Sequence, residues 1–134
     1  MYKRQVTGDL TGDVTGDVTG DLTGSVDTGQ SVIAGVTATK TSTSIASIDT
    51  FSASTYRSAN YQIQVIQGTN YNTTSINLLH DGTNSYMTEY GTLNQPTGIA
   101  TFSAQIDSGT IQLLGYPAST NSTTFKVIYS AVKS

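Results

Sequence analysis

The chain of 134 residues has no cysteine and no tryptophan, one histidine and two prolines, and only 11% of its residues are charged. Without cysteine, disulfide bridges and thiolate chemistry are excluded. One histidine with no cysteine also excludes the usual zinc-binding sets. No apolar run is long enough to span a membrane as a helix, and no apolar core follows the basic N-terminus. We therefore predict neither a membrane span nor a secretory signal, and neither a cofactor nor a metal.

The few charges are distributed unevenly along the sequence. Residues 1–30 hold five aspartates against Lys3 and Arg4 and so account for the net charge of −3. The remaining residues balance four acidic against four basic side chains. Binding to nucleic acid through its phosphates needs a dense basic surface, and no such stripe is present. A nucleic-acid partner is therefore not expected.

What the sequence does contain is a tetrad repeat at its start, in which a branched apolar residue returns every fourth position. Thr-Gly-Asp fills the intervals four times and Thr-Gly-Ser once. Gly, Thr and Asp are poor helix formers, which favours an extended arm over a helix. A turn at each Thr-Gly-Asp, with glycine at positive φ, is the alternative. The apolar residues of the repeat are Val6, Leu10, Val14, Val18, Leu22 and Val26.

In either conformation the segment cannot bury its own apolar row. Repeat units of this kind need neighbours to cover their apolar face. We therefore predict that these six residues drive attachment and self-association, with a symmetric homotrimer favoured. The aspartates at positions 9, 13, 17 and 21 are interpreted as a solvated acidic face rather than a calcium ladder, because neither the nine-residue calcium-binding repeat nor the EF-hand pattern is present.

Residues 31–134 have the pattern of an all-β domain. Short runs of alternating apolar and polar residues are separated by turn sequences such as Asp81-Gly82-Thr83-Asn84. We predict an antiparallel β-sandwich or jelly-roll-like domain. A loop or junction is expected over residues 24–31. The expected strands lie within residues 31–37, 42–54, 61–65, 74–80, 86–93, 99–106, 110–116 and 123–132.

Catalytic chemistry has little support in the sequence. His80 stands beside Asp81, yet Asp81-Gly82 between two strand-like runs is by itself a strong hairpin signal. The carboxylates outside the arm show no spacing that singles out an acid–base pair, and most are expected in or beside turns. We predict that the protein is not an enzyme. The alternative is a hydrolase that uses His80 and Asp81.

Tyrosine supplies most of the aromatic content, with eight residues in the chain. Together with Asn, Ser and Gly, tyrosine is typical of adaptable recognition surfaces. Tyr71, Tyr86 and Tyr90 are the candidates for surface recognition of a glycan or a partner protein. The alternative is that several of the tyrosines pack in the core with their hydroxyls at its rim.

The sequence resembles fibre-like virion structural proteins of bacteriophages, of the marine cyanophage type. The tract VTGDLTGDVTGDVTGDLTG is similar to their tetrad repeats, and residues 56–64, 79–83 and 88–92 resemble a terminal module of such proteins. The resemblance implies a structural or adhesive component of the virion, assembled in the host cytoplasm, with a trimeric fibre as its usual setting. It implies no catalytic residues. The shortness of the chain favours a short spike or a small capsid-decorating fibre over a long tail fibre.

We therefore expect a non-enzymatic virion protein with two parts. Residues 1–30 would attach to other virion proteins of the capsid, neck or tail, and residues 31–134 would project and contact a host surface glycan. A capsid-decorating head fibre without a receptor role and a self-standing carbohydrate-binding module are the alternatives.

Overall fold

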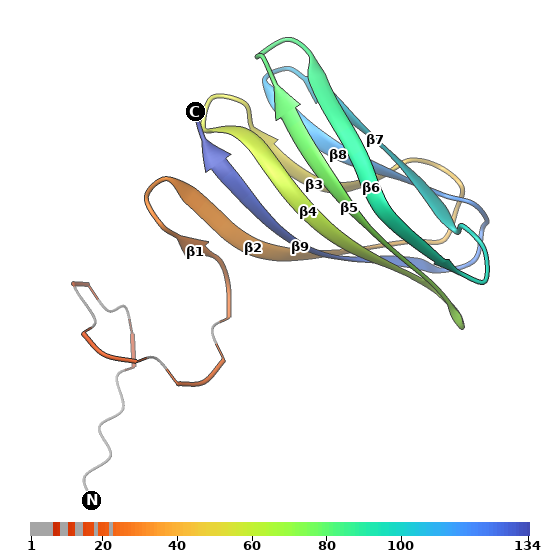
Figure 1. Ribbon diagram of the computed structural model, residues 1–134, viewed down its shortest axis with the longest axis horizontal. Helices are drawn as coiled ribbons and strands as arrows, with labels where there is room; N and C mark the ends of the chain where they lie inside the picture. Colours follow the sequence, from red (N-terminus) through yellow and green to blue (C-terminus); the bar gives the residue numbers. More distant parts are fainter. Residues whose placement is uncertain (1–6, 9–10, 13–14, 18, 22) are drawn as a thin grey trace, which may run out of the picture.

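The computed structural model describes residues 7–8, 11–12, 15–17, 19–21 and 23–134, and all regular elements within these residues are β-strands. They form two antiparallel sheets packed face to face (Figure 1). The larger sheet has the order β1 (Val26–Asp27), β2 (Ser31–Lys40), β9 (Thr123–Lys133), β4 (Tyr56–Gln67), β5 (Asn70–His80), β6 (Ser85–Gln95). The smaller sheet has the order β3 (Ala46–Ser52), β8 (Thr110–Pro117), β7 (Ala100–Asp107). The predicted all-β antiparallel sandwich is confirmed.

The core lies between the two sheets and follows the alternation of the sequence. In β4, Tyr61, Ile63 and Val65 are buried, whereas Gln62 and Gln64 face solvent. Alternation of this kind marks a strand with one face on the core. The same pattern brings inward the apolar residues of β5, β8 and β9, namely Ile76, Leu78, Ile111, Leu113, Phe125, Val127 and Ala131.

The strand β3 departs from simple alternation. Its register against β8 shifts between Ser47 and Asp49, so that the pairing accommodates one extra residue. A β-bulge lets two consecutive side chains face the same way. Ile48 and Asp49 are accordingly both buried.

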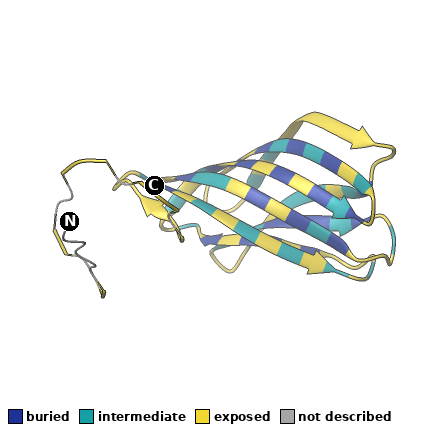
Figure 2. Ribbon diagram, turned by 90° about the horizontal axis from the view of Figure 1, so that it is seen from below, coloured by how far each residue is buried: buried dark blue, intermediate teal, exposed yellow. Residues whose placement is uncertain are grey.

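The outermost strand of the large sheet, β6, is exposed along nearly its whole length (Figure 2). It pairs with β5 on one side only. The large sheet has six strands against three in the smaller sheet, so part of it extends beyond the sandwich core.

The junction between arm and sheet is a hairpin. Val26 and Asp27 form β1 and pair with β2, within the region expected to be a loop. The two Asp27 oxygens each lie 3.0 Å from the Lys133 ammonium of β9, and Asp27 Oδ1 also accepts a hydrogen bond from the Gly29 amide at 2.7 Å. The hydrogen bond from the Gly29 amide has the larger effect on the pKa of the Asp27 carboxyl, and together with the Lys133 contact it holds that pKa below its ordinary value. The sheet therefore begins before the predicted domain boundary at residue 31.

The described part of the arm bends at each repeat glycine. Gly8, Gly12, Gly16, Gly20 and Gly24 have φ between +120° and +135°, a region that residues with a side chain rarely adopt. These positions therefore show a bend at each Thr-Gly step, which was the alternative to a continuous strand. Val6, Leu10, Val14, Val18 and Leu22 lie outside the described residues, so Val26 alone of the six predicted assembly residues has a described position.

Candidate recognition surface on the large sheet

The face of the large sheet that points away from the core is open to solvent. Pairing registers arrange its outward side chains in rows that cross the strands. One such row runs from Thr37 through Lys126, Gln64 and Thr73 to Leu93. Side chains directly opposite on neighbouring strands lie roughly 4.5–5.5 Å apart at Cβ, so each row forms a continuous surface.

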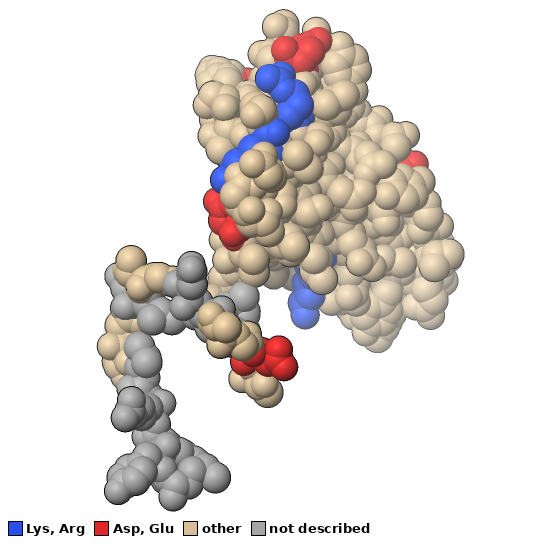
Figure 3. Space-filling model, turned by 60° about the vertical axis from the view of Figure 1, so that its left-hand side comes forward, with Lys and Arg blue, Asp and Glu red and all other residues tan. Residues whose placement is uncertain are grey.

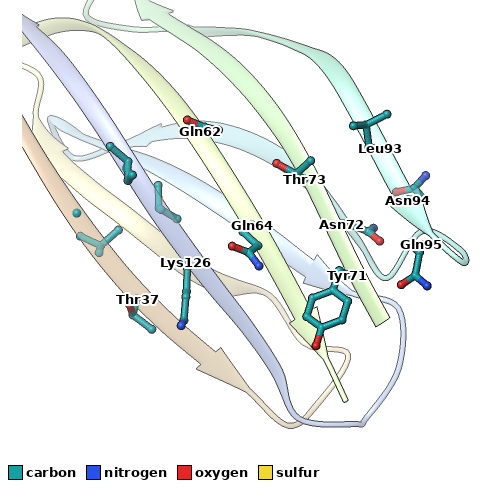
Figure 4. A pocket seen from close by; sticks show the side chains of 14 residues that line it. Thr37, Gln62, Gln64, Tyr71, Asn72, Thr73, Leu93, Asn94, Gln95 and Lys126 are labelled. Atoms are coloured by element: carbon teal, nitrogen blue, oxygen red, sulfur yellow. The ribbon is translucent and has the colours of Figure 1, made fainter. Parts of the chain in front are cut away.

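A groove of about 850 Å³ crosses this face, from β2 over β9, β4 and β5 to β6 (Figure 4). Gln64 lies between Lys126 and the exposed ring of Tyr71, while Gln95 and Leu93 line the side formed by β6. Tyr71 pairs with Gln95 across the β5–β6 ladder. The groove thus combines an aromatic ring, amide side chains and hydroxyl groups on one surface.

The electrostatics of the groove are simple. Lys126 is the one charged side chain among the described residues that line it, and no carboxylate is present there. On the face shown in Figure 3, charged side chains gather in a few places and most of the surface is uncharged. A ligand in this groove would therefore meet neutral hydrogen-bonding groups, aliphatic side chains such as Leu93 and Ile128, and a single ammonium group.

The three predicted recognition tyrosines are all exposed on the large sheet, but the structure does not bring them to one site. Tyr71 lines the groove, whereas Tyr86 lines a separate hollow of about 500 Å³ near the opposite end of β5. Tyr90 lies between them on β6, and its hydroxyl accepts a hydrogen bond from Asn60 Nδ2 at 3.3 Å. Tyr71 is therefore the member of the predicted set that belongs to the groove.

Tyr86 is engaged by the β5–β6 turn. Its hydroxyl donates to Asp81 Oδ2 at 2.9 Å, and the pKa of the Tyr86 phenol is raised by this hydrogen bond to a carboxylate. Asp81 Oδ1 accepts from the backbone amides of Thr83 and Asn84, at 2.8 and 2.7 Å. Those amides, followed by the side chains of Asn84 and Tyr86, lower the pKa of Asp81.

His80 and Asp81 are engaged in separate sets of hydrogen bonds. His80 is buried, with its Nε2 2.6 Å from the Tyr56 carbonyl oxygen and its Nδ1 accepting from the Gly82 amide at 3.1 Å. These contacts assign the proton to Nε2. Both ring nitrogens are thus used by backbone groups, and the Asp81 oxygens are used by the turn. The hairpin interpretation of this segment is confirmed by its geometry.

Asp49 and Tyr61 form a buried polar pair between the two sheets. The Tyr61 hydroxyl of β4 donates to Asp49 Oδ2 of β3 at 2.9 Å. Burial raises the pKa of the Asp49 carboxyl, while the hydrogen bonds from Tyr61 and from the Thr50 backbone oppose that rise. Burial, together with the neighbouring carboxylate, raises the pKa of Tyr61. The pair lies in the core.

Sequence reasoning did not identify Lys126, Gln62 or Gln64 as site residues. Each alternates with buried neighbours, as Lys126 does between Phe125 and Val127, so the outward direction of its side chain is readable from the pattern. The alternation does not predict the strand order, which places β9 beside β4 and β4 beside β5. Within the described residues no three His, Cys, Asp or Glu side chains are grouped to hold a metal ion. No helix of these residues is long and apolar enough to cross a membrane.

Comparison with solved structures finds phage tailspike proteins. The tailspike of Acinetobacter phage vB_ApiP_P1 is 15% identical with a TM-score of 0.47, over 90% of this chain and 25% of that one. Tailspike gp49 of Acinetobacter baumannii bacteriophage Fri1, described as a capsular polysaccharide depolymerase, is 13% identical with a TM-score of 0.48, over 81% and 19%. The tailspike of Acinetobacter baumannii phage AM24 is 7% identical with a TM-score of 0.44, over 76% and 26%.

This chain thus spans about a quarter or less of the length of those tailspikes. No protein-family model matches the sequence, and no curated protein shows significant similarity to it.

Proposed function

We propose that this protein is a non-enzymatic structural component of a phage virion, a short fibre or spike with a projecting β-sandwich. Residues 1–30 attach it to other virion proteins and to further copies of itself, as a homotrimer. The large-sheet groove contacts a glycan on the host surface. Assignment to the cyanophage type is supported by the tetrad repeat alone.

One observation carries the proposal: the arm and the Tyr71 end of the groove lie toward opposite ends of the sandwich. The arm joins the large sheet through β1, opposite the first residues of β2 (Figure 1). Tyr71 and Gln95 lie at the other end of the sheet, beside the β4–β5 turn. A protein held through its arm would therefore present the groove outward.

The groove carries the groups that bind a glycan. Sugars offer hydroxyl groups to amide side chains such as Gln62 and Gln64, and C–H faces to an aromatic ring such as Tyr71. The groove is open along the sheet, which suits a chain molecule. Asp49, Asp81 and His80 are each engaged in structural hydrogen bonds, and this supports the non-enzymatic part of the proposal.

Two measurements on the full-length protein test the proposal. Sedimentation of the parent chain should show an oligomer, and replacing Val14 and Val18 with serine should shift it toward monomer with the β-sandwich still folded. A monomeric parent would refute the assembly role. Retention on host polysaccharide should fall roughly tenfold in Tyr71→Ala, because one aromatic contact is lost.

The outcomes also separate the alternatives. An oligomer that incorporates into virions but does not retain host polysaccharide would be a capsid-decorating fibre without a receptor role. Polysaccharide binding by a monomer would indicate a carbohydrate-binding module. Release of new reducing ends from the polysaccharide would show enzymatic activity and refute the non-enzymatic assignment.

A further inference from the structure

A second feature of the large sheet is an aliphatic patch at the end where the arm joins it. We define the aliphatic patch as Val26 of β1, Ile33 of β2, and Ile128 and Val132 of β9. These side chains are 40%, 48%, 64% and 50% exposed, respectively. Val26 pairs directly with Ile33, and Ile33 pairs with Ser130, the residue between Ile128 and Val132 on the same face. The four side chains therefore share one outward surface.

The composition of the outward face changes along the sheet. Around the aliphatic patch the intervening outward positions are small, namely Ser31, Gly35 and Ser130. The groove begins directly beside the patch, since Gly35 and Ile128 also line it, and its other outward positions carry mainly amides, hydroxyls and Lys126. A single large aliphatic side chain exposed on a sheet is common. Four adjacent β-branched side chains with no charge among them are instead typical of a contact surface.

The hairpin fixes Val26 on the sheet beside the rest of the patch. Besides the contacts of Asp27 with Lys133, the Thr28 amide donates to the Ser31 carbonyl oxygen at 2.8 Å, and the Lys133 amide donates to the Gln30 carbonyl oxygen at 2.9 Å. These bonds set Val26 in register with Ile33. Val26 is also the last apolar residue of the tetrad series. The apolar row of the arm is therefore continuous in sequence with the patch on the sheet.

We propose that the aliphatic patch is a contact surface between copies of this chain, extending the association of the arms onto the large sheet. The inference rests on the proposed function, in which several arms associate. Arms bundled about a symmetry axis bring their last apolar residues, the Val26 side chains, to that axis. Tethering through the arms raises the effective concentration of one patch at another, so that a small aliphatic surface is sufficient.

Cysteine cross-linking of the full chain tests this surface directly. The chain has no cysteine, so Ile33→Cys or Ile128→Cys introduces a unique thiol. With a short bis-maleimide, which joins two thiols, both variants should give covalent dimers at protein concentrations where the parent sediments as an oligomer. Ile45→Cys is the matched control, because Ile45 is 50% exposed but lies outside the large sheet, just before β3. It should remain uncross-linked.

Charge substitutions provide the second measurement. Ile33→Lys and Ile128→Lys should each raise the concentration at which the oligomer half-dissociates by about tenfold or more, since an aliphatic contact is replaced by a buried ammonium group. Ile45→Lys should leave that concentration unchanged.

The possible results separate this inference from the proposed function. An oligomeric parent whose patch cysteines do not cross-link, and whose lysine variants assemble normally, would overturn the patch contact while leaving association through the arm intact. A parent that is monomeric at every concentration would overturn both. If a lysine variant fails to fold, the cysteine variants alone decide between these results.

Discussion

Tyr61→Phe is the substitution that best tests the account of the sandwich core. The Tyr61 side chain is fully buried, and its hydroxyl is hydrogen-bonded to Asp49 Oδ2 across the two sheets. Phenylalanine keeps the ring, whose centroid lies 5.4 Å from that of Tyr129, so the substitution opens no cavity of ring size. It removes one hydrogen bond to a buried carboxylate, which should lower the free energy of unfolding by about 1.5–3 kcal/mol at neutral pH.

The matched variant Asp49→Asn separates charge from hydrogen bonding. Asparagine keeps an oxygen to accept the Tyr61 hydroxyl but carries no charge to desolvate. In that background, Tyr61→Phe should cost only about 1 kcal/mol, the usual value for a neutral hydrogen bond. The difference between the two costs is the coupling energy of the pair in a double-mutant cycle.

Acidification should reduce the effect of Tyr61→Phe. Burial raises the folded-state pKa of the Asp49 carboxyl above its ordinary value. Its protonated form is therefore favoured in the folded state, and the stability gained in this way is present at low pH and lost as pH rises through the folded-state pKa. Removing the hydroxyl mainly harms the ionised form, so the difference between variant and parent should shrink as Asp49 becomes protonated.

Urea unfolding of the parent, both single variants and the double variant, at one protein concentration, measures all of these terms. Comparison at equal pH cancels the titration of the other carboxylates. Additive effects in the cycle, or a Tyr61→Phe cost that is the same at neutral and acidic pH, would refute the assignment of a charged, hydrogen-bonded pair.

Three further predictions concern other parts of the fold. Gly115→Ala would place a Cβ 2.6 Å from Ile48 Cδ1, so the free energy of unfolding should fall by about 1–3 kcal/mol and the urea midpoint should fall with it. An unchanged midpoint would contradict the close packing. Asp81→Ala should lower the melting temperature at neutral pH but not in strong acid. The folded-state pKa of the Asp81 carboxyl is lowered, so the stability that this carboxylate contributes is lost as pH falls through that pKa. A loss of melting temperature that is the same at both pH values would contradict this. His80→Ala leaves the Tyr56 carbonyl oxygen without its donor and should cost about 1–3 kcal/mol in urea unfolding, while polysaccharide retention stays unchanged; reduced retention by the folded variant would argue for a direct role.

The fold class could be predicted from the sequence because half-buried strands have a period of two. Tyr61, Ile63 and Val65 with their intervening glutamines show it directly, and the structure places them as expected. The strand β1 could not be predicted in the same way. It consists of two residues, and the apolar one, Val26, also fits the tetrad repeat. Its pairing depends on contacts with residues near the opposite end of the sequence, such as Lys133.

The recognition surface was only partly predictable for a similar reason. Exposure of Tyr71 could be inferred from the amide-rich sequence around it, but its proximity to Lys126 depends on the order β9-β4-β5. Alternation specifies which face a side chain occupies and not which strand lies beside it. The inward position of Asp49 was missed because the bulge shifts the alternation of β3 by one residue.

The glycines of the arm also bear on how such a protein can change in length. The five glycines share nearly the same φ, so the same backbone angle recurs at every fourth residue. Inserting or deleting whole units leaves every later unit in phase with the sheet, whereas any other insertion would put a side chain where only glycine fits. With attachment through the arm, as proposed, the distance between the β-sandwich and the attachment point would change in steps of one repeat without redesign of either end.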